Sequence, residues 1–183
     1  MNGVHAHLRI ALHPQSIAIV GASENPNKVG GRPLQFLKRY GFKGAVYPIN
    51  PSRSTTQGVQ SFRRLADLPE APDVAIIAVA GEAAIDALEE CGAAGVKVAV
   101  VMSSGFSESN PVGGKEVERR MVERARAQGM RIIGPNSQGI TNFGNGAIAS
   151  FSTMFAEAEP ADGPFGIVGQ SGAMSAAVYG LHR

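Results

Sequence analysis

A glycine-rich segment, Gly21–Gly31, follows the apolar run Ser16–Gly21 and leads into an amphipathic stretch. A turn of this kind presents backbone N–H groups and the positive end of a helix dipole, which suits phosphate groups. It departs from the dinucleotide fingerprint, because Ser23 and Pro26 occupy the second and third glycine positions. A purely structural turn stays open as the alternative. The candidate ligand-binding residues in this segment are Gly21, Ala22, Ser23, Lys28, Val29 and Gly30.

Polar residues also follow the second apolar run, Gly44–Ile49, where the chain continues with Asn50, Ser52 and Arg53. An NAD site usually has an Asp or Glu at this point for the ribose hydroxyls, and this segment has neither. A guanidinium suits a phosphate on the ribose, so the 3′-phosphate of coenzyme A (CoA) and the 2′-phosphate of NADP both stay open. Arg53 is equally compatible with a solvated surface arginine.

Three further turns carry small polar residues. The segment Met102–Glu108 contains adjacent serines and a glycine, which allow a ligand to approach the backbone closely. The segment Gly134–Gly139 brings Asn136 and Ser137 to the end of another apolar run, and Gly169–Ala173 is a third turn of phosphate-binding type. Ordinary surface loops remain the alternative for the first two. The third has only part of the serine hydrolase elbow and lacks its Asp/His context, so that activity is rejected.

The histidines and the single cysteine favour neither a metal site nor a thiol enzyme. His5, His7 and His13 lie in an N-terminal segment expected to be mobile, and His182 lies near the C-terminus. None has carboxylate or cysteine neighbours at metal-ligand spacing, so no metal site is predicted. Cys91 lies beside small residues in a helical pattern and is interpreted as a buried apolar side chain.

The elements that would position these turns alternate along the chain. Short β-branched runs predict five strands, and the longer amphipathic stretches between them predict helices and a turn. Strand–helix alternation with short connections, and strands apolar on both faces, predict an α/β fold with a doubly wound parallel sheet, which is Rossmann-like. The predicted strands are 16–21, 44–49, 73–79, 97–102 and 130–133, and the predicted helices are 29–40, 82–94 and 113–128, with a short helical piece within 65–72.

The chain divides into four predicted parts. Residues 1–14 form a tail, and residues 15–142 form the Rossmann-like domain. Residues 143–163 are rich in glycine and proline and are interpreted as a linker. Residues 164–183 begin a new strand–turn–helix unit, whose single strand and helix have no neighbours within the sequence to bury their faces.

Composition narrows the class of protein. The 183 residues hold 44% hydrophobic and 17% charged side chains, which is typical of a globular chain. A net charge of +2 predicts no nucleic-acid partner, since such proteins usually carry a basic face. No apolar run reaches the roughly 18 residues of a membrane span, and the N-terminus lacks the apolar core of a signal peptide, so no membrane partner is expected. One cysteine fits a reducing, cytoplasmic location.

Six stretches together resemble the NDP-forming acyl-CoA synthetases, the family of ADP-forming acetate–CoA ligases, which are relatives of the succinyl-CoA synthetase α subunit. They are SIAIVGASENPNKVGGRPLQFL, GFKGAVYPINP, LADLPEAPDVAIIAVAGEA, GVKVAVVMSSGF, GMRIIGPNSQGI and GPFGIVGQSGAMS. They lie in the family's order between about residues 15 and 180. The resemblance implies that residues 15–142 are the CoA-binding domain, and that residues 164–183 begin a second, flavodoxin-like ligase domain.

The resemblance also implies roles for the turns. The first loop, with Ser23, would hold the CoA phosphates, and a Gln-Ser-Gly turn would hold the phosphate of a phosphohistidine loop. The remaining contacts with CoA would come from Asn50, Pro51, Val79, Ala80, Ser103, Ser104, Gly105, Asn136 and Ser137. The phosphate of the phosphohistidine loop would contact Gln170, Ser171 and Gly172. The implied reaction joins a carboxylic acid to CoA through an acyl phosphate, with an NTP cleaved to NDP. The phosphohistidine and the ATP-grasp domain that binds ATP and magnesium are expected in further domains of the same or another chain. The chain alone is expected to be inert, and a homo-oligomer is conceivable.

Two departures from the family pattern and two rival functions complete the interpretation. The family often has Gly-Pro-Asn-Cys-Leu-Gly where this chain has Ser137 and Gln138, which indicates an unusual acyl pocket. The family often has proline near Ala80 and Gly81, which predicts a looser loop here. A stand-alone, non-catalytic CoA-binding module is the first alternative. An NADP-binding reductase is the second alternative. The absence of a catalytic Tyr/Lys or Cys/His pair from this sequence counts against it.

Overall fold

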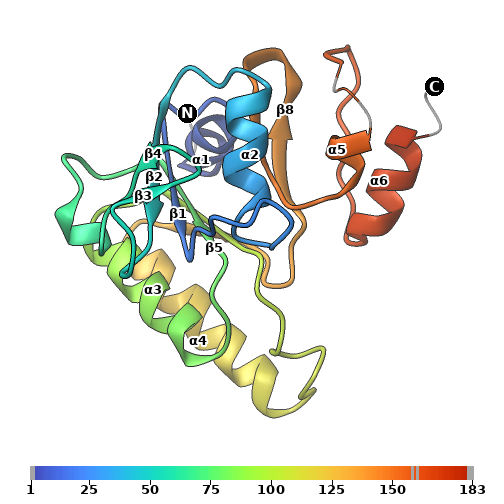
Figure 1. Ribbon diagram of the computed structural model, residues 1–183. Coiled ribbons are helices and arrows are strands. Elements are labelled where there is room, and N and C mark those ends of the chain that lie inside the picture. The colour runs from blue at the N-terminus through green and yellow to red at the C-terminus, as the bar shows by residue number, and fades with distance from the viewer. Residues whose placement is uncertain (1–2, 158, 160, 181–183) are drawn as a thin grey trace.

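A computed structural model describes residues 3–157, 159 and 161–180. At its centre is a five-stranded parallel sheet in the order β2-β1-β5-β6-β7 (Figure 1). The register places Ile17 of the first strand between Val46 and Val74 of its two neighbours. The strands are β1 (Ser16–Val20), β2 (Ala45–Ile49), β5 (Val74–Ile77), β6 (Val98–Val101) and β7 (Arg131–Ile133). The parallel α/β sheet predicted from the apolar runs is therefore confirmed.

Helices cover both faces of this sheet. Figure 1 shows α3 (Glu82–Ala93) and α4 (Gly113–Ala127) side by side on one face, with α2 (Arg32–Arg39) on the other. Successive strand residues point to opposite faces, so each strand contributes to two separate cores. The α3/α4 core contains Ala18, Ala75, Ile77, Ala99 and Val101, and the α2 core contains Ile17, Ile19, Val74, Ile76, Val98 and Val100.

The helix boundaries follow their sequence signals closely. Pro33 lies in the first turn of α2, where a residue without an N–H group fits. Gly95 and Gly129 follow α3 and α4 with φ of +86° and +74°, the left-handed conformation in which glycine commonly ends a helix. The piece predicted within 65–72 is a single 3₁₀ turn, Leu65–Asp67.

The N-terminal residues form a helix that the sequence interpretation did not include. Residues of α1 (Gly3–Leu12) pack on the sheet through the buried side chain of Ala11. The side-chain amides of Asn142 and Asn145 donate to the carbonyl oxygen of Leu12 at 2.9 and 3.0 Å, and the His7 ring lies 2.8 Å from Gly129 O. This segment is therefore attached to the domain, where mobility had been expected.

The segment interpreted as an irregular linker contains ordered structure. A hairpin joins β8 (Gly139–Asn142) through the turn Phe143–Asn145 to β9 (Ala147–Ser150), and α5 (Met154–Glu157) follows. All four residues of β9 are buried. Ile148 joins Phe36 and Phe155 in a small core beside α2. Tertiary packing thus orders a segment whose glycines and prolines had indicated a linker.

The strand expected at the start of the unit 164–183 is absent from the described part of the chain. Phe165 is 91% exposed and Val168 is fully exposed, and no neighbouring strand offers them hydrogen bonds. A parallel strand depends on such neighbours, so the apolar run alone cannot hold an extended conformation. The helix predicted after the turn is present as α6 (Gly172–Gly180), and its Tyr179 ring lies 5.2 Å from that of Phe143. His182 lies outside the described residues. None of the described helices is long and apolar enough to cross a bilayer.

Candidate functional site

The predicted loops meet along the carboxyl ends of the parallel strands. The chain goes from β1 to β2 on one side and then returns to β5 on the other side of β1. The loops that follow β1 and β5 therefore diverge, which is the place where open α/β sheets bind ligands.

The loop after β1 is folded back on itself. Gly21 has φ of +85°, and a Cβ atom at Gly30 would lie only 2.1 Å from Gly21 O. The Ser23 N–H donates to Gly30 O at 3.2 Å, which closes the loop. The side chain of Asn25 accepts the N–H of Asn27 at 2.9 Å. The glycines here are required because two backbone segments touch.

This loop lines a hollow of about 450 Å³. Lys28 is exposed at the hollow, and the N–H groups of Val29 and Gly30 donate to no acceptor within the described residues. Free N–H groups and an ammonium beside a helix start are the donors that a phosphate requires. The lining residues are Gly21, Ser23, Asn27, Lys28, Val29, Gly30 and Ala78.

The end of β2 is joined to this loop by Asn50. Its side-chain Nδ2 donates to Ala22 O at 2.9 Å, and its Oδ1 accepts the N–H of Ser52 at 2.9 Å. Asn50 therefore holds the loop in place. Pro51 and Arg53 are exposed, and neither lines the hollow; the guanidinium of Arg53 has no protein partner among the described residues.

A chain of contacts continues across the remaining strands. A Cβ atom at Gly21 would lie 2.7 Å from Cγ1 of Val79, which follows β5. The Ser103 hydroxyl, after β6, donates to Val79 O, and the N–H of Asn136, after β7, donates to Ser103 O at 2.9 Å. The structure thus brings the ends of β1, β5, β6 and β7 together in one line.

The remaining residues predicted after β5, β6 and β7 are more exposed. Ala80, Ser104, Gly105 and Asn136 are exposed, while Ser137 is half-buried and accepts the N–H of Gly139 at 3.1 Å. The carboxylate of Glu108 accepts the N–H groups of Gly105 and Phe106. The hydrogen bond from Gly105 is the main cause that lowers the pKa of the Glu108 carboxyl. Glu108 therefore keeps the turn after β6 closed as an anion.

The Gln170–Gly172 turn lies next to this line. A Cβ atom at Gly172 would lie 2.5 Å from Cγ of Gln138, which follows Ser137 directly. Ser171 Oγ accepts the N–H of Met174 at 3.3 Å at the start of α6. Gln170 and Ser171 are exposed. The second predicted phosphate turn thus lies beside the turn after β7.

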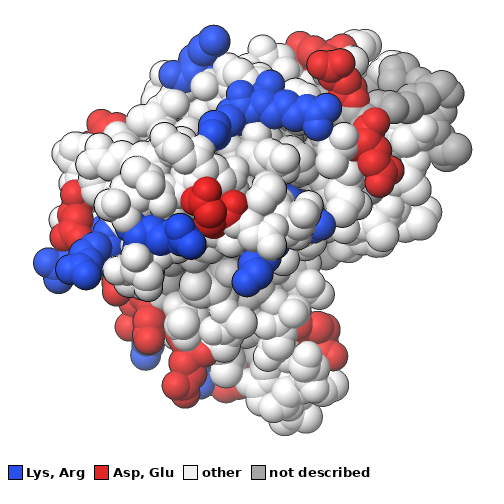
Figure 2. Space-filling model, in the orientation of Figure 1, with Lys and Arg blue, Asp and Glu red and all other residues white. Residues whose placement is uncertain are grey.

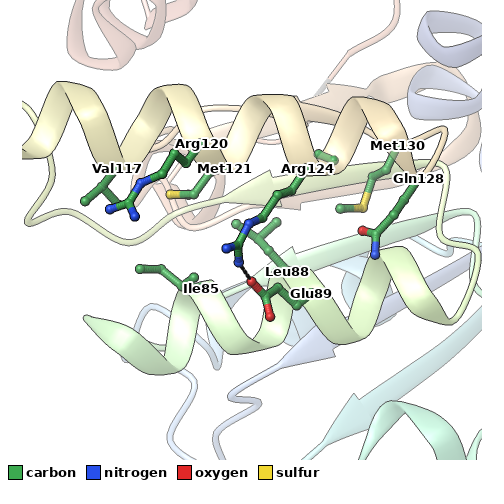
Figure 3. Close-up of a pocket in the computed structure, with 10 residues that line it drawn as sticks. Ile85, Leu88, Glu89, Val117, Arg120, Met121, Arg124, Gln128 and Met130 are labelled. Atoms are coloured by element: carbon green, nitrogen blue, oxygen red, sulfur yellow. Dashed lines mark hydrogen bonds and ion pairs between the residues drawn. The ribbon is translucent and has the colours of Figure 1, made fainter.

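A separate cavity of about 200 Å³ lies between α3 and α4 (Figure 3). None of the predicted site residues lines it. Figure 3 shows the guanidinium of Arg124 reaching across the cavity to the carboxylate of Glu89, and the two groups form an ion pair. The other lining residues are mainly the apolar side chains of Ile85, Leu88, Val117, Met121, Ala125 and Met130, together with Arg120 and Gln128.

Among the described residues, the titratable groups away from the strand ends give no sign of a second chemical centre. The described residues hold no cluster of three or more His, Cys, Asp or Glu suited to a metal ion. Cys91 is fully buried, and burial raises the pKa of its thiol to about 12. On the face that Figure 2 shows, Lys and Arg side chains are interspersed with Asp and Glu, without an extended basic surface.

Three residues at the site were missed from the sequence. Asn27 and Ala78 line the hollow, and Gln57 contacts the loop after β1 from the hairpin formed by β3 (Thr55–Thr56) and β4 (Val59–Gln60). Asn27 lay within the segment already selected. Gln57-Gly58 is not one of the usual two-residue hairpin pairs, so neither the hairpin nor its contact with residue 23 was signalled by the sequence.

Residues 15–142 match the family model described as "CoA binding domain". The chain belongs to this CoA-binding domain family. The resemblance proposed from the six stretches is therefore confirmed, and CoA is the cofactor of the family.

Curated relatives of this chain include ADP-forming acetate–CoA ligases. It is 39% identical to "Acetate--CoA ligase [ADP-forming] II" of Archaeoglobus fulgidus over 90% of this chain and 24% of the relative. It is 35% identical to the α subunit of ADP-forming acetate–CoA ligase I of Pyrococcus furiosus over 94% of this chain and 37% of that subunit. The chain thus spans between about a quarter and somewhat more than a third of the length of these relatives.

A solved structure supports the same assignment. The "dinucleotide forming Acetyl-coenzyme A synthetase 1" of Ca. Korarchaeum cryptofilum, in complex with phosphate and ADP, superposes with a TM-score of 0.78 at 38% identity. The match covers 94% of this chain and 36% of that chain. The CoA-binding domain therefore corresponds to the CoA-binding part of ADP-forming acyl-CoA synthetases.

Proposed function

We propose that this chain supplies the CoA site of an enzyme that joins a carboxylic acid to CoA through an acyl phosphate, with an NTP cleaved to NDP. The observation that carries the proposal is the line of turns from Asn50 to Asn136, with a hollow at its centre that offers free N–H groups and Lys28. The activities named for the relatives support the reaction type.

The proposed orientation of CoA follows the chemistry of each turn. Its phosphates lie at the loop after β1, where Lys28 and the N–H groups of Val29 and Gly30 neutralise and bind them. The adenosine end lies over Asn50 and Pro51, with Arg53 near the 3′-phosphate. The pantetheine arm passes Val79, Ala80, Ser103, Ser104 and Gly105, so that the thiol ends near Asn136 and Ser137.

The turn beside Gln138 extends the proposed site toward acyl transfer. Gly172 lies against Gln138, so a phosphoryl group held by Gln170, Ser171 and Gly172 would be close to the thiol end of CoA. A helix N-terminus stabilises such an anion. The phosphohistidine and the ATP-grasp domain that binds ATP and magnesium are proposed to come from further domains or another chain. The contact between Gly172 and Gln138 favours a ligase over a stand-alone CoA-binding module.

Location and partners are proposed on the same basis. A single buried Cys91 fits a reducing compartment such as the cytoplasm, and the balanced charge fits a small-molecule partner better than nucleic acid. We expect the chain by itself to bind CoA without forming acyl-CoA.

Calorimetric titration with CoA, NADP and NAD tests this proposal. We expect CoA to bind at least tenfold more tightly than either dinucleotide, because the loop after β1 departs from their fingerprint and no acid follows β2. Tight NADP binding without a CoA signal would contradict the proposal. Lys28→Ala should weaken CoA binding. The matched control, Lys97→Ala, removes an equal charge at the opposite, amino-terminal end of β6 and should leave CoA binding unchanged.

A further inference from the structure

The β3–β4 hairpin has a turn whose residue choice is unusual. Gln57 and Gly58 both have positive φ, at 48° and 78°, which is the geometry of a two-residue type I′ turn. Glycine adopts this geometry freely, and Asn or Asp is the usual partner before it. Glutamine lacks the short local hydrogen bond that favours Asn in the left-handed region. Its presence therefore calls for a contact that a shorter side chain cannot make.

That contact joins the two ends of the loop after β1. The side-chain Nε2 of Gln57 donates to Ser23 O and to Gly31 O, both at 2.9 Å. One amide group thus uses both of its N–H bonds to connect the start of the loop with the residue that precedes α2. Between these two points lie Lys28, Val29 and Gly30, which line the hollow.

The main chain of Gln57 makes two further charged contacts. Its N–H donates to the Glu24 carboxylate at 2.8 Å, and its carbonyl oxygen accepts from the Lys38 ammonium. Glu24 is an acid within a loop suited to phosphates, where it would repel an anionic ligand. The hydrogen bond holds this carboxylate against the hairpin turn, and Glu24 does not line the hollow.

The hairpin itself has a firm base on the sheet. The hydroxyls of Thr56 and Ser61 share a buried hydrogen bond of 2.7 Å. The N–H of Asn50 donates to Phe62 O at 2.9 Å, which attaches the chain after the hairpin to the end of β2. The side chain of Gln57 therefore projects toward the loop from a turn that is itself attached to the end of β2.

We propose that Gln57 is a positioning residue: it fixes the loop 23–31 in the conformation that binds the CoA phosphates. This inference rests on the proposed function for the identity of the ligand. The effect of Gln57 on the order of the loop does not depend on which ligand binds there. Gln57 is not among the residues that line the hollow, so we expect its loss to act through the loop.

Two variants separate this role from a general effect on folding. Gln57→Asn keeps a residue that suits the I′ turn but shortens the side chain by one methylene, so its amide no longer spans both carbonyls. Gln57→Met keeps the length and removes the donors. Gln60→Asn, an exposed residue of the same hairpin with no side-chain hydrogen bond among the described residues, is the matched control.

Hydrogen exchange, thermal unfolding and calorimetry are measured on all three variants and the wild type. We expect Gln57→Asn to exchange the amides of residues 23–31 faster, to unfold at the same or a higher temperature, and to bind CoA about tenfold more weakly, which corresponds to about 1.4 kcal/mol. Gln57→Met should give the same exchange and binding changes. Gln60→Asn should match the wild type in all three measurements.

Other outcomes would contradict the positioning role of Gln57 or the proposed function. Unchanged exchange in residues 23–31 would overturn the inference, and so would faster exchange with unchanged CoA affinity. A fall in unfolding temperature that accounts for the lost affinity in both variants would reduce Gln57 to an ordinary structural residue. If the wild-type chain does not bind CoA, the proposed function fails, and the exchange rates still decide whether Gln57 orders the loop.

Discussion

The side-chain amide of Asn50 donates to the carbonyl oxygen of Ala22 across 2.9 Å and so joins the end of β2 to the loop after β1. The same side chain accepts the N–H of Ser52, so both of its polar ends are used within the protein. Asn50, which the sequence suggested as a ligand contact, therefore also connects two turns of the site.

Asn50→Ala should lower both stability and CoA affinity. Removing the amide leaves Ala22 O without its donor, and such a loss typically destabilises a protein by about 1–2 kcal/mol. Urea unfolding measures the first effect and calorimetry with CoA the second. Asn145→Ala, which also removes an amide–carbonyl bond but at α1, is the control. An Asn50 variant that is less stable yet binds CoA normally would show that this connection does not shape the site.

Gly30→Ala should distort the loop by steric contact alone. The new Cβ atom would lie 2.1 Å from Gly21 O, so the backbone must move, and overpacking of this kind costs about 1–3 kcal/mol. CoA affinity should fall with it. Gly163→Ala is the matched control, because no atom lies within 4 Å of its Cβ position. Equal unfolding free energies for the two variants would mean that the loop opens without penalty.

Arg53→Ala should weaken binding of CoA more than that of 3′-dephospho-CoA. The exposed guanidinium is free to meet the 3′-phosphate, and a solvated contact of this type is worth about 1 kcal/mol, or roughly fivefold in affinity. Arg63→Ala removes an equal charge from another exposed position and should change neither affinity. Equal losses for the two ligands would show that Arg53 does not recognise the 3′-phosphate.

Cys91 should be unreactive in the folded protein. Burial, and then the charge of Glu90, raises the pKa of its thiol from 9.0 to about 12, so the thiolate is scarce at pH 8. An aromatic disulfide reagent should label it only after urea is added. Because the folded pKa is raised, its contribution to stability is complete below pH 9 and is lost as the pH rises toward 12. Cys91→Ala should therefore lose less stability than the wild type between pH 9 and 11. Rapid labelling of the native chain would contradict this.

The local sequence pattern was sufficient to predict the strands of the central sheet, because both faces of these strands are buried. Runs such as Val74–Ile77 and Val98–Val101 are apolar throughout because helices cover both sides, and this made the parallel sheet predictable. The glycines and Pro33 marked the helix ends for local reasons of backbone geometry. The position of the site then followed from the rule that ligands bind at the carboxyl ends of such strands.

Contacts distant in sequence were not predictable in this way. The strand β9 is ordered because Ile148 packs against Phe36 of α2, and the run Phe165–Val168 is not a strand because no described neighbour pairs with it. The role of Gln57 depends on a hairpin and a loop whose approach no periodicity encodes. Sequence alone therefore predicted which loops meet, and the structure identified the side chains that hold them together.

The pairing of β8 with β9 has a consequence for how the chain should be divided. The family match ends at residue 142, in the middle of this hairpin. A protein shortened to that boundary would keep β8 as an unpaired edge and would expose Phe36, since Ile148 and Phe155 would be removed. Exposed edges and apolar surfaces promote association between copies. We therefore expect the smallest portion that folds without exposing this edge and Phe36 to extend past residue 142, at least through α5.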